Sequence, residues 1–432
     1  MNLTKLRFDV SKFKVDFKRK TTLSTYFPKG TQFYYGYPAG EDSGFLNRVS
    51  PATEELVAAR VFCNAGPSVM AVGFSSSVAS REHQAAYETF NIPQLPKVQT
   101  VIMPDTIHQN LTGRERNEAI RKFLKKSVTP GMFVMAQPYL DRPMEALYQI
   151  PPTLTAWLND KNNMEHYIAS NMLPKRYGVY KSGAEFASKY TSLSLPVVIK
   201  ASSSSSGDGV YLCRKQEDLD IAAAKLKRLN GTVLAEQLID IKKNYGMHFG
   251  IPADATKPID LLGINEQIVT DEGAFLGGII RSREIPDELA QAAVWLRDKI
   301  LPAVREMGWH GIGGFDVLID KDNNAYFIDC NFRMTGMSAY HFMIANNEIK
   351  HPMLSIGGEF HGSQEEIISK LAPYAGVEGS KNFMQIITLT CYKNIWRFNA
   401  AVTFSNEKQL KDQLRTLLKA GVVSQTIEQF LK

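Results

Sequence analysis

The chain has 432 residues, of which 44% are hydrophobic and 22% are charged, a composition typical of a folded protein of two or three domains. Its 50 basic and 44 acidic residues give a net charge of +6, too small and too dispersed to predict nucleic-acid binding. No apolar run approaches a membrane span, and the first residues lack the apolar core of a signal peptide. The four cysteines are far apart with no metal-like spacing, so we expect reduced thiols in a cytoplasmic protein.

The first 150 residues alternate short apolar runs with polar, helix-forming stretches. The apolar runs are 68–74, 98–103 and 132–136, and between them lies a charged, leucine-containing stretch at 112–126. Strands that alternate with helices predict a small α/β domain with a parallel sheet. A basic run at 12–20 alternates charged and apolar residues, which favours an edge strand protected by lysines over a nucleic-acid or membrane patch.

The segment 27–47 is the most unusual part of this domain. It contains four aromatic residues around Gly36, followed by the acids Glu41 and Asp42. We interpret it as an aromatic loop with two alternative roles, which the sequence leaves open. It either lines a substrate pocket or packs on its own domain.

The apolar segment 195–200 is predicted to be a strand that ends in Lys200. A lysine at a strand end supplies the charge that phosphates need, and small residues after it let backbone N–H groups approach an anion. A flexible hairpin tip is the alternative. A Walker A loop is excluded, because no Gly-Lys-Ser/Thr follows the glycines and the next element is a strand. The loop residues are Ser202, Ser203, Ser204, Ser205, Ser206, Gly207, Asp208 and Gly209.

A strand tipped with arginines is predicted at 275–283, where Arg281 and Arg283 stand at the end of an apolar run. Such arginines suit the clamping of a phosphoryl group or a substrate carboxylate, and an ordinary surface strand end is the equal alternative. The stretch 287–307 is predicted to be a helix that ends at Gly308 and leads into the next strand.

That next strand begins a hairpin, because two apolar runs flank the polar turn 320–324. Each run contains one acidic residue, Asp316 in the first and Asp329 in the second, and burying unpaired carboxylates is costly. Asn331 and Arg333 follow Asp329 with strand periodicity and so extend the same face. Two carboxylates and an amide oxygen form a hard donor set suited to magnesium. A buried salt-bridge cluster between the strands is the alternative.

The end of the chain predicts a small α+β extension. Two strand-like runs, 383–392 and 400–404, precede a helix that Asn406 caps, with Gln409 three positions later. The helix has an apolar stripe typical of a buried face. The stripe consists of Leu410, Leu414, Leu417 and Leu418.

Taken together, the residues 151–345 resemble the ATP-grasp superfamily, whose members activate a carboxylate as an acyl phosphate and pass it to an amine, a thiol or a similar nucleophile. The hairpin with Arg333 resembles the family's magnesium-binding hairpin and neighbouring arginine. Lys200 resembles its second phosphate lysine, and the serine loop resembles its mobile lid. Asp329 departs from the pattern, which more often has a glutamate at this metal position.

The resemblance also implies nucleotide-binding residues outside these motifs. Lys161, within Asn159-Asp160-Lys161, corresponds to the first phosphate lysine, with Lys175 as a rival. The strand and hinge around Glu236 resemble those that read adenine, and Asn244 falls where the family often keeps an acid for the ribose. The implied nucleotide ligands are Lys161, Lys200, Ser203, Ser204, Ser205, Ser206, Gly207, Glu236, Gln237, Leu238 and Asn244.

The implied fold class is α/β and α+β: an ATP-grasp fold with an N-terminal parallel-sheet α/β domain and a small C-terminal α+β extension. The expected units are 1–150, 151–235 with the phosphate lid, 236–375 with the adenine hinge and metal hairpin, and 376–432.

The implied activity is an ADP-forming ligation of a carboxylate to an amine, with ATP and magnesium, or manganese in its place, as cofactors. Arg333, helped by Arg281 or Arg283, would stabilise the transferring group. The layout resembles amino-acid or peptide ligases, and the chain has no Met-Lys-Met biotin-attachment motif. A hydroxyl phosphotransferase and a non-catalytic nucleotide-binding protein are the alternatives. We expect small-molecule partners and neither nucleic acid nor membrane, and a homodimer is left open.

Overall fold

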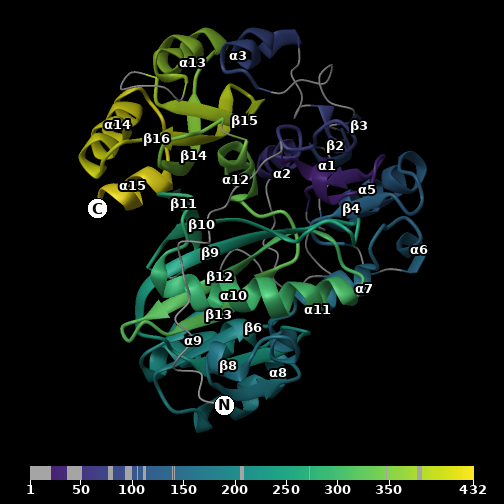
Figure 1. Cartoon of the computed structure of the whole chain (residues 1–432), viewed down its shortest axis with the longest axis vertical. Helices are drawn as coiled ribbons and strands as arrows, with labels where there is room; N and C mark the ends of the chain where they lie inside the picture. The colour runs from purple at the N-terminus through teal and green to yellow at the C-terminus, as the bar shows by residue number, and fades with distance from the viewer. Residues whose placement is uncertain are drawn as a thin grey trace.

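The computed structural model (Figure 1) describes residues 21–36, 51–75, 81–92, 100–104, 106–109, 113–138, 140, 142–204, 209–271, 273–346, 348–376 and 382–432. The strands in these ranges form three sheets. One belongs to the N-terminal region, a large one runs from the middle to the end of the chain, and a small one lies at the opposite end of the molecule from the C-terminal helices (Figure 1). Within these ranges no helix is long and apolar enough to cross a membrane.

The N-terminal region is an α/β domain with a parallel sheet, which confirms the prediction from its alternating runs. The strand order is β3-β2-β1-β4, and each neighbouring pair is parallel. The strands are β1 (Gln32–Tyr34), β2 (Met70–Phe74), β3 (Thr100–Met103) and β4 (Phe133–Met135). The α-helices are α1 (Leu23–Tyr26), α2 (Pro51–Ala59), α3 (Gln84–Thr89), α4 (Thr106–Gln109), α5 (Gly113–Ser127) and α6 (Arg142–Glu145).

Strand β1 corrects the interpretation of the segment 27–47 as an aromatic loop. Gln32–Tyr34 form a central strand of the sheet, and Phe33 is buried in the core. A strand of three residues is too short for its alternation to be visible in the sequence. Residues 37–47 and the basic run 12–20 lie outside the described residues, so their roles stay predictions.

The large sheet has eight strands in the order β13-β12-β9-β10-β11-β14-β16-β15, and every neighbouring pair is antiparallel. The predicted hairpin is confirmed as β12 and β13 at one edge. The strands are β9 (Ile241–Ile251), β10 (Asp260–Val269), β11 (Phe275–Ile280), β12 (Gly311–Asp320), β13 (Ala325–Asn331), β14 (Met353–His361), β15 (Met384–Tyr392) and β16 (Ile395–Thr403).

The C-terminal strands continue this sheet. Strand β16 pairs with β14 along nine residues, from Met353 opposite Thr403 to His361 opposite Ile395. The predicted boundary at 375/376 therefore falls between two paired strands, and the division into four units stays a prediction. The capped helix is confirmed as α14 (Glu407–Lys419), where the Asn406 Oδ1 accepts from the Gln409 N–H at 2.9 Å. Helices α12 (Ser338–Ala345), α13 (Gln364–Leu371) and α15 (Gln425–Leu431) pack around these strands (Figure 1).

The small antiparallel sheet has the order β5-β8-β6-β7. Helices α8 (Gly183–Lys189) and α9 (Gln216–Leu226) cover one face, where Ile199 and Ala235 are buried. Strand alternation then directs Lys200 and Glu236 to the opposite face, toward the hairpin. The strands are β5 (Arg176–Tyr180), β6 (Val197–Ala201), β7 (Val210–Cys213) and β8 (Val233–Gln237).

The helical stretch expected at 287–307 is real but irregular. A 3₁₀ turn and α10 (Ala290–Trp295) lead through a π-helical turn at Leu296–Ile300 into α11 (Leu301–Glu306). Pro302 lacks the N–H that would close the preceding α-helical turn, which accounts for the wider turn there. Gly308 has φ +90, the left-handed conformation expected of a residue that ends a helix.

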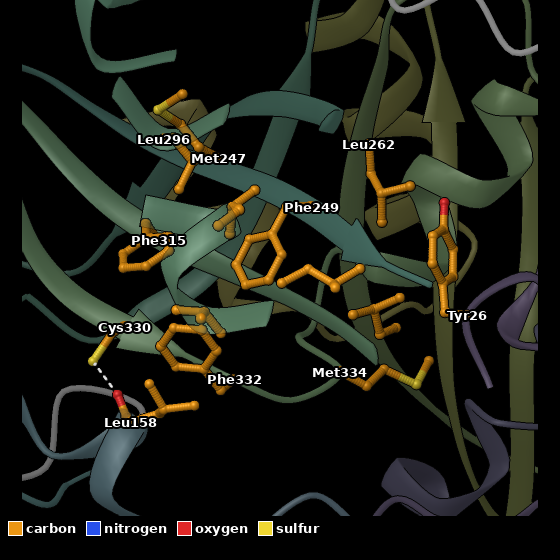
Figure 2. Close-up of a cluster of buried hydrophobic side chains, with 14 of the residues drawn as sticks. Tyr26, Leu158, Met247, Phe249, Leu262, Leu296, Phe315, Cys330, Phe332 and Met334 are labelled. Atoms are coloured by element: carbon orange, nitrogen blue, oxygen red, sulfur yellow. Dashed lines mark hydrogen bonds between the residues drawn. The ribbon is translucent and has the colours of Figure 1, made fainter. Parts of the chain in front are cut away.

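An aromatic core fixes the hairpin against the rest of the molecule (Figure 2). Phe249, Phe315 and Phe332 pack with ring centroids 5.6 to 5.7 Å apart on one face of the large sheet. The Cys330 Sγ lies on this side and approaches the Leu158 carbonyl at 3.0 Å, at the end of α7 (Pro152–Asn159), so Cys330 is a core residue. The opposite face of the hairpin is left for polar side chains.

Candidate functional site

The two acids of the hairpin lie directly opposite each other. Asp316 of β12 pairs with Asp329 of β13, whereas Val317 pairs with Phe327, so Ile328 has no partner in the ladder. A one-residue bulge of this kind redirects the side chains around it and frees a carbonyl group. The Ile328 carbonyl accepts a hydrogen bond from the Lys200 Nζ at 3.1 Å, which joins the small sheet to the hairpin.

The two carboxylates, Asp316 and Asp329, carry like charges and repel each other. Burial and the negative charge of Asp329 raise the pKa of Asp316 to about 7, while the Gln267 amide and Arg333 act in the other direction. The Gln267 Nε2 donates to Asp316 Oδ1 at 2.7 Å. Two carboxylates in one buried place require positive charge nearby.

Lys161 supplies one such charge. Its Nζ lies 3.0 Å from Asp329 Oδ1 and 3.2 Å from the Ser204 carbonyl, and its side chain is buried. The lysine opens a 3₁₀ turn that Asp160 caps by accepting from the Asn162 N–H at 2.9 Å. Its backbone N–H donates to the Ser202 carbonyl, so the turn and the serine segment are held together.

Lys175, the rival to Lys161, lies elsewhere. It is exposed, and its Nζ sits 5.6 Å from the centre of the Tyr177 ring. Its backbone is bound to the end of β8, where the Gln237 N–H donates to the Lys175 carbonyl at 2.8 Å. The structure therefore brings Lys161, and not Lys175, to the hairpin acids.

Lys200 and Glu236 form a buried ion pair on the face of the small sheet that is turned toward the hairpin. The Lys200 Nζ lies 2.5 Å from Glu236 Oε2, and Arg176 Nη2 lies 3.2 Å from Glu236 Oε1. Arg176 also donates to the Lys161 carbonyl at 3.3 Å. Sequence reasoning missed Arg176, since an arginine at the start of a short strand carries no signal of its own.

The residues of the expected adenine and ribose positions lie next to this pair. Gln237 ends β8 and Leu238 follows it, half-buried. Asn244 of β9 lies on the same face of the large sheet as Asp316, because Gly246, two residues on, pairs with Asp316. Among the described residues the buried Asn244 Oδ1 has no hydrogen-bond partner.

The serine loop is only partly described. Ser204 contacts Lys161 through its carbonyl, and its hydroxyl donates to the Ala201 carbonyl at 3.3 Å. Ser203 is exposed beside it, while Ser205, Ser206 and Gly207 lie outside the described residues, so the phosphate-binding role of these residues stays a prediction.

The structure does not bring Arg281 or Arg283 to the hairpin. The Arg281 Nε is 3.2 Å from each carboxylate oxygen of Glu266. Gln267 contacts Asp316, so its neighbour Glu266 lies on the opposite face of β10. Arg281, which binds Glu266, therefore lies on that opposite face as well. Arg283 donates to the carbonyl of Ile344 in α12. Strand-end position alone did not reveal on which face these arginines would lie.

A buried polar network supports the segment that follows Arg333. Asn265 Oδ1 lies 2.8 Å from His248 Nε2 and 3.3 Å from His341 Nε2, so both histidines donate to it. His248 Nδ1 is then the acceptor for the Thr335 hydroxyl at 3.3 Å. Burial lowers the pKa of His248 to about 4 and that of His341 well below its usual value, which keeps both rings neutral. Sequence reasoning missed this network because its members are far apart along the chain.

His310 lies on the other side of Arg333. Its Nε2 is 3.1 Å from Gln149 Oε1, and its ring meets Phe27 edge-on. Burial lowers its pKa to about 4. Together with Arg333 and Trp309 it lines a small, mostly apolar cavity of about 30 Å³ against the N-terminal domain. This environment indicates a packing role for His310.

Part of the chain matches the model of a known protein family. Residues 174–331 match the family model described as L-aspartate–L-methionine ligase, ATP grasp. The small subunit of 2-oxoglutarate carboxylase from Hydrogenobacter thermophilus is 24% identical over 205 residues, which are 45% of this chain and 42% of that protein. The match thus spans less than half the length of this curated relative.

Two solved structures show the same fold over nearly the whole chain. An ADP complex of N5-carboxyaminoimidazole ribonucleotide synthetase superposes with a TM-score of 0.57 at 12% identity, covering 91% of this chain and 97% of that one. The chain has the ATP-grasp fold. The biotin carboxylase domain dimer of the H. thermophilus 2-oxoglutarate carboxylase, in complex with MgADP, ADP and bicarbonate, gives a TM-score of 0.54 at 14% identity, covering 94% of this chain and 93% of that one. At such identities the likeness shows the fold and leaves the substrates open.

ATP and magnesium are the cofactors of the ATP-grasp superfamily, and the hairpin fits the metal. Asp316, Asp329 and Asn331 offer carboxylate and amide oxygens on paired strands, the hard donors that magnesium takes while phosphate oxygens complete its shell. Burial and the charge of Asp329 raise the pKa of Asp316, and a bound cation would favour its ionised form. No group of three or more His, Cys, Asp or Glu residues that could hold a metal occurs in the described ranges.

Proposed function

We propose that the chain is an ADP-forming ligase that activates a carboxylate as an acyl phosphate and couples it to an amine. The observation that carries this proposal is the convergence of two buried lysines on the hairpin. Lys161 forms an ion pair with Asp329, and Lys200 donates a hydrogen bond to the Ile328 carbonyl at the hairpin bulge. Two fixed cations beside two metal-binding acids form the charge pattern that polyphosphate binding requires.

Each of these residues has a distinct task. Lys161 and Lys200 neutralise phosphate oxygens, and Glu236, held by Arg176, keeps Lys200 in place until the nucleotide arrives. Magnesium bound by Asp316, Asp329 and Asn331 would neutralise the remaining phosphate charge and orient the γ-phosphoryl group. Positioning and charge stabilisation of this kind supply most of the rate of a phosphoryl transfer.

Arg333 is the residue that we assign to the reacting groups. It follows Asn331 on the polar face of the hairpin and is close enough to Asp316 to oppose the rise in its pKa. A guanidinium in this place can bind the transferring phosphoryl group and then the oxyanion formed when the amine attacks the acyl phosphate. The serine loop closes the site, because an acyl phosphate hydrolyses readily in water.

An amino acid or peptide is the substrate class we favour. The support is the family model over residues 174–331, whose description names an amino-acid ligase. Carboxylation, the reaction for which the 2-oxoglutarate carboxylase of H. thermophilus is named, is the competing use of the same acyl-phosphate chemistry.

We also place the protein in the cytoplasm, with small molecules as partners. Its four cysteines are free thiols, which is typical of proteins in a reducing compartment. A homodimer is supported only by the dimer named for the H. thermophilus domain.

The test is an incubation of the purified chain with ATP, magnesium and a panel of acids and amines, followed by nucleotide analysis and product mass. We expect ADP and an amide from one acid–amine pair, and a hydroxamate when hydroxylamine replaces the amine. AMP as the main product would exclude the acyl-phosphate route. ADP with a stable phosphorylated alcohol would establish the phosphotransferase instead.

A further inference from the structure

The N-terminal domain places an arginine beside the segment that follows Arg333. Arg60 comes directly after α2, a helix that packs on β15 of the large sheet. In Figure 1, α2 lies in the middle of the molecule, between the N-terminal domain and α12. A Cβ atom built on Gly336 would stand 3.9 Å from the Arg60 Nη1, so the guanidinium borders the turn between β13 and α12.

The partners of Arg60 are neutral. Its Nη2 donates to Asn399 Oδ1 at 3.0 Å, and its guanidinium carbon lies 5.8 Å from the centre of the Tyr35 ring. Among the described residues its buried Nε has no hydrogen-bond partner. A half-buried cation paired only with neutral groups is costly unless an anion completes its surroundings.

The turn beside Arg60 belongs to the same face as the hairpin acids. Thr335 is fixed to His248, and His248 pairs with Gly314, which in turn lies opposite Asn331. From Arg333 to Gly336 the chain advances three residues, a span of at most about 11 Å. The two arginines therefore border one short stretch of backbone.

The N-terminal sheet supports the same location. Tyr35, on which Arg60 stacks, is the first residue after the carboxyl end of β1. Ligands of open α/β sheets bind outside the carboxyl ends of the strands. Arg60 thus connects the carboxyl end of β1 to the Arg333–Gly336 turn.

We propose that Arg60 binds the free carboxylate of the amino acid that supplies the amine. The proposal rests on the ligase function proposed above, since it assigns one end of that reaction's second substrate. The carboxylate receives a charge-assisted, two-pronged hydrogen bond from the guanidinium, and the amine is directed toward the acyl phosphate at Arg333. Arg60 selects α-amino acids over simple amines and does not touch the reacting atoms.

The test uses calorimetric titration of the full chain saturated with Mg-ADP. The probes are the standard L-amino acids and, for each one that binds, its α-carboxamide. We expect at least one amino acid to bind the wild type, and its amide to bind at least about tenfold more weakly. Arg60→Ala should weaken the amino acid by about tenfold to a hundredfold and leave the amide unchanged, and Arg60→Lys should recover part of the loss.

Two control variants separate binding from structure. Arg415→Ala removes an exposed arginine of α14 and should bind like the wild type. Asn399→Ala removes the neutral tether of Arg60 and keeps the charge, so it should retain the preference for acid over amide. Thermal unfolding and ADP affinity are measured for every variant to verify folding.

Several results would overturn the proposal. They are an unchanged affinity in Arg60→Ala, an equal loss for acid and amide, and a wild type that binds no amino acid. The proposed function is tested separately by turnover. Arg60-dependent amino-acid binding without ADP formation would reject the ligase and keep the binding site, whereas ligation that is indifferent to Arg60 would reject only the site.

Discussion

At the scale of single residues, the site is governed by buried charge. Asp316 and Asp329 face each other in a place that water reaches poorly, and the structure offsets them with Lys161 and Arg333. Removing one member of such a group leaves the others uncompensated, and that loss costs more than the interaction itself contributes. Single substitutions here should therefore have large effects.

Lys161 and Lys175 provide a matched pair of variants. Lys161→Ala should lower the rate of ADP formation by about a hundredfold or more, because a fixed cation at the phosphates is lost. Lys175→Ala should change the rate less than about twofold, since that lysine is exposed on Tyr177. Steady-state assays of ADP release, with thermal unfolding as a control of folding, make the comparison. Equal losses in the two variants would contradict the assignment of the first phosphate lysine.

The neutral histidine pair gives the stability a pH dependence. The pKa of His248 falls from its usual 6.5 in the unfolded chain to about 4 in the fold. The unfolded state therefore binds more protons between these values, and this histidine stabilises the fold fully above pH 6.5 and progressively less as the pH falls. Each such histidine contributes a slope of about 1.4 kcal/mol per pH unit.

The measurement compares His248→Gln with the wild type, because Asp316, with its raised pKa, contributes a slope of the opposite sign. Unfolding by denaturant is followed at several values between pH 5 and 6.5. His248 makes the free energy of unfolding rise with pH in this range. We expect the variant to lack this contribution, so that its slope against pH is lower than that of the wild type by about the slope of one histidine. Parallel curves for the two proteins would show that His248 is not held neutral.

At the scale of elements, the hairpin was predictable and its bulge was not. Acids inside apolar runs on either side of a polar turn indicate paired strands with a functional face, and the structure has that pair. The register shift that frees the Ile328 carbonyl depends on contacts with Lys200 from another sheet, which local sequence does not encode. Contacts with residues distant along the chain also determine the positions of Arg176 and Arg281. For this reason the sequence did not reveal Arg176 as a site residue, or that Arg281 lies on the face away from Asp316.

The serine loop is predicted to respond to nucleotide as one element. Residues 202–209 have small side chains and two glycines, so phosphate oxygens should provide bonds that the loop cannot make alone. Amide hydrogen exchange of a peptide spanning this loop should slow markedly when magnesium and a non-hydrolysable ATP analogue are added. An unchanged exchange rate would remove the loop from the nucleotide site.

At the scale of the whole molecule, one eight-stranded sheet connects the nucleotide site to the end of the chain. The sequence indicated the C-terminal strands and their capped helix but presented them as an appendage. Pairing between β14 and β16 is a long-range contact across a segment of other structure, and no periodicity reports it. The parallel N-terminal sheet could be predicted from the sequence because each of its strands lies close to its helices along the chain.

A truncation tests this continuity. A chain that ends at residue 375 loses β15, β16 and α14 and leaves Ile356 and Phe360 of β14 without the residues that bury them. We expect the truncated protein to aggregate, since it presents an unpaired apolar strand. Size-exclusion chromatography and circular dichroism report the outcome. A soluble, folded 1–375 fragment that binds ADP would show that the C-terminal strands are an independent unit.

Formation of an acyl phosphate at the Asp316–Asp329 hairpin is the central step of the proposed reaction, and transfer of a labelled oxygen tests it directly. The acid that supports turnover is labelled with ¹⁸O in its carboxylate and incubated with ATP, magnesium and the amine. If the carboxylate attacks the γ-phosphorus, one labelled oxygen passes to the inorganic phosphate, and the nucleotide product is unlabelled ADP. Label in AMP, or phosphate without label, would contradict the proposed function.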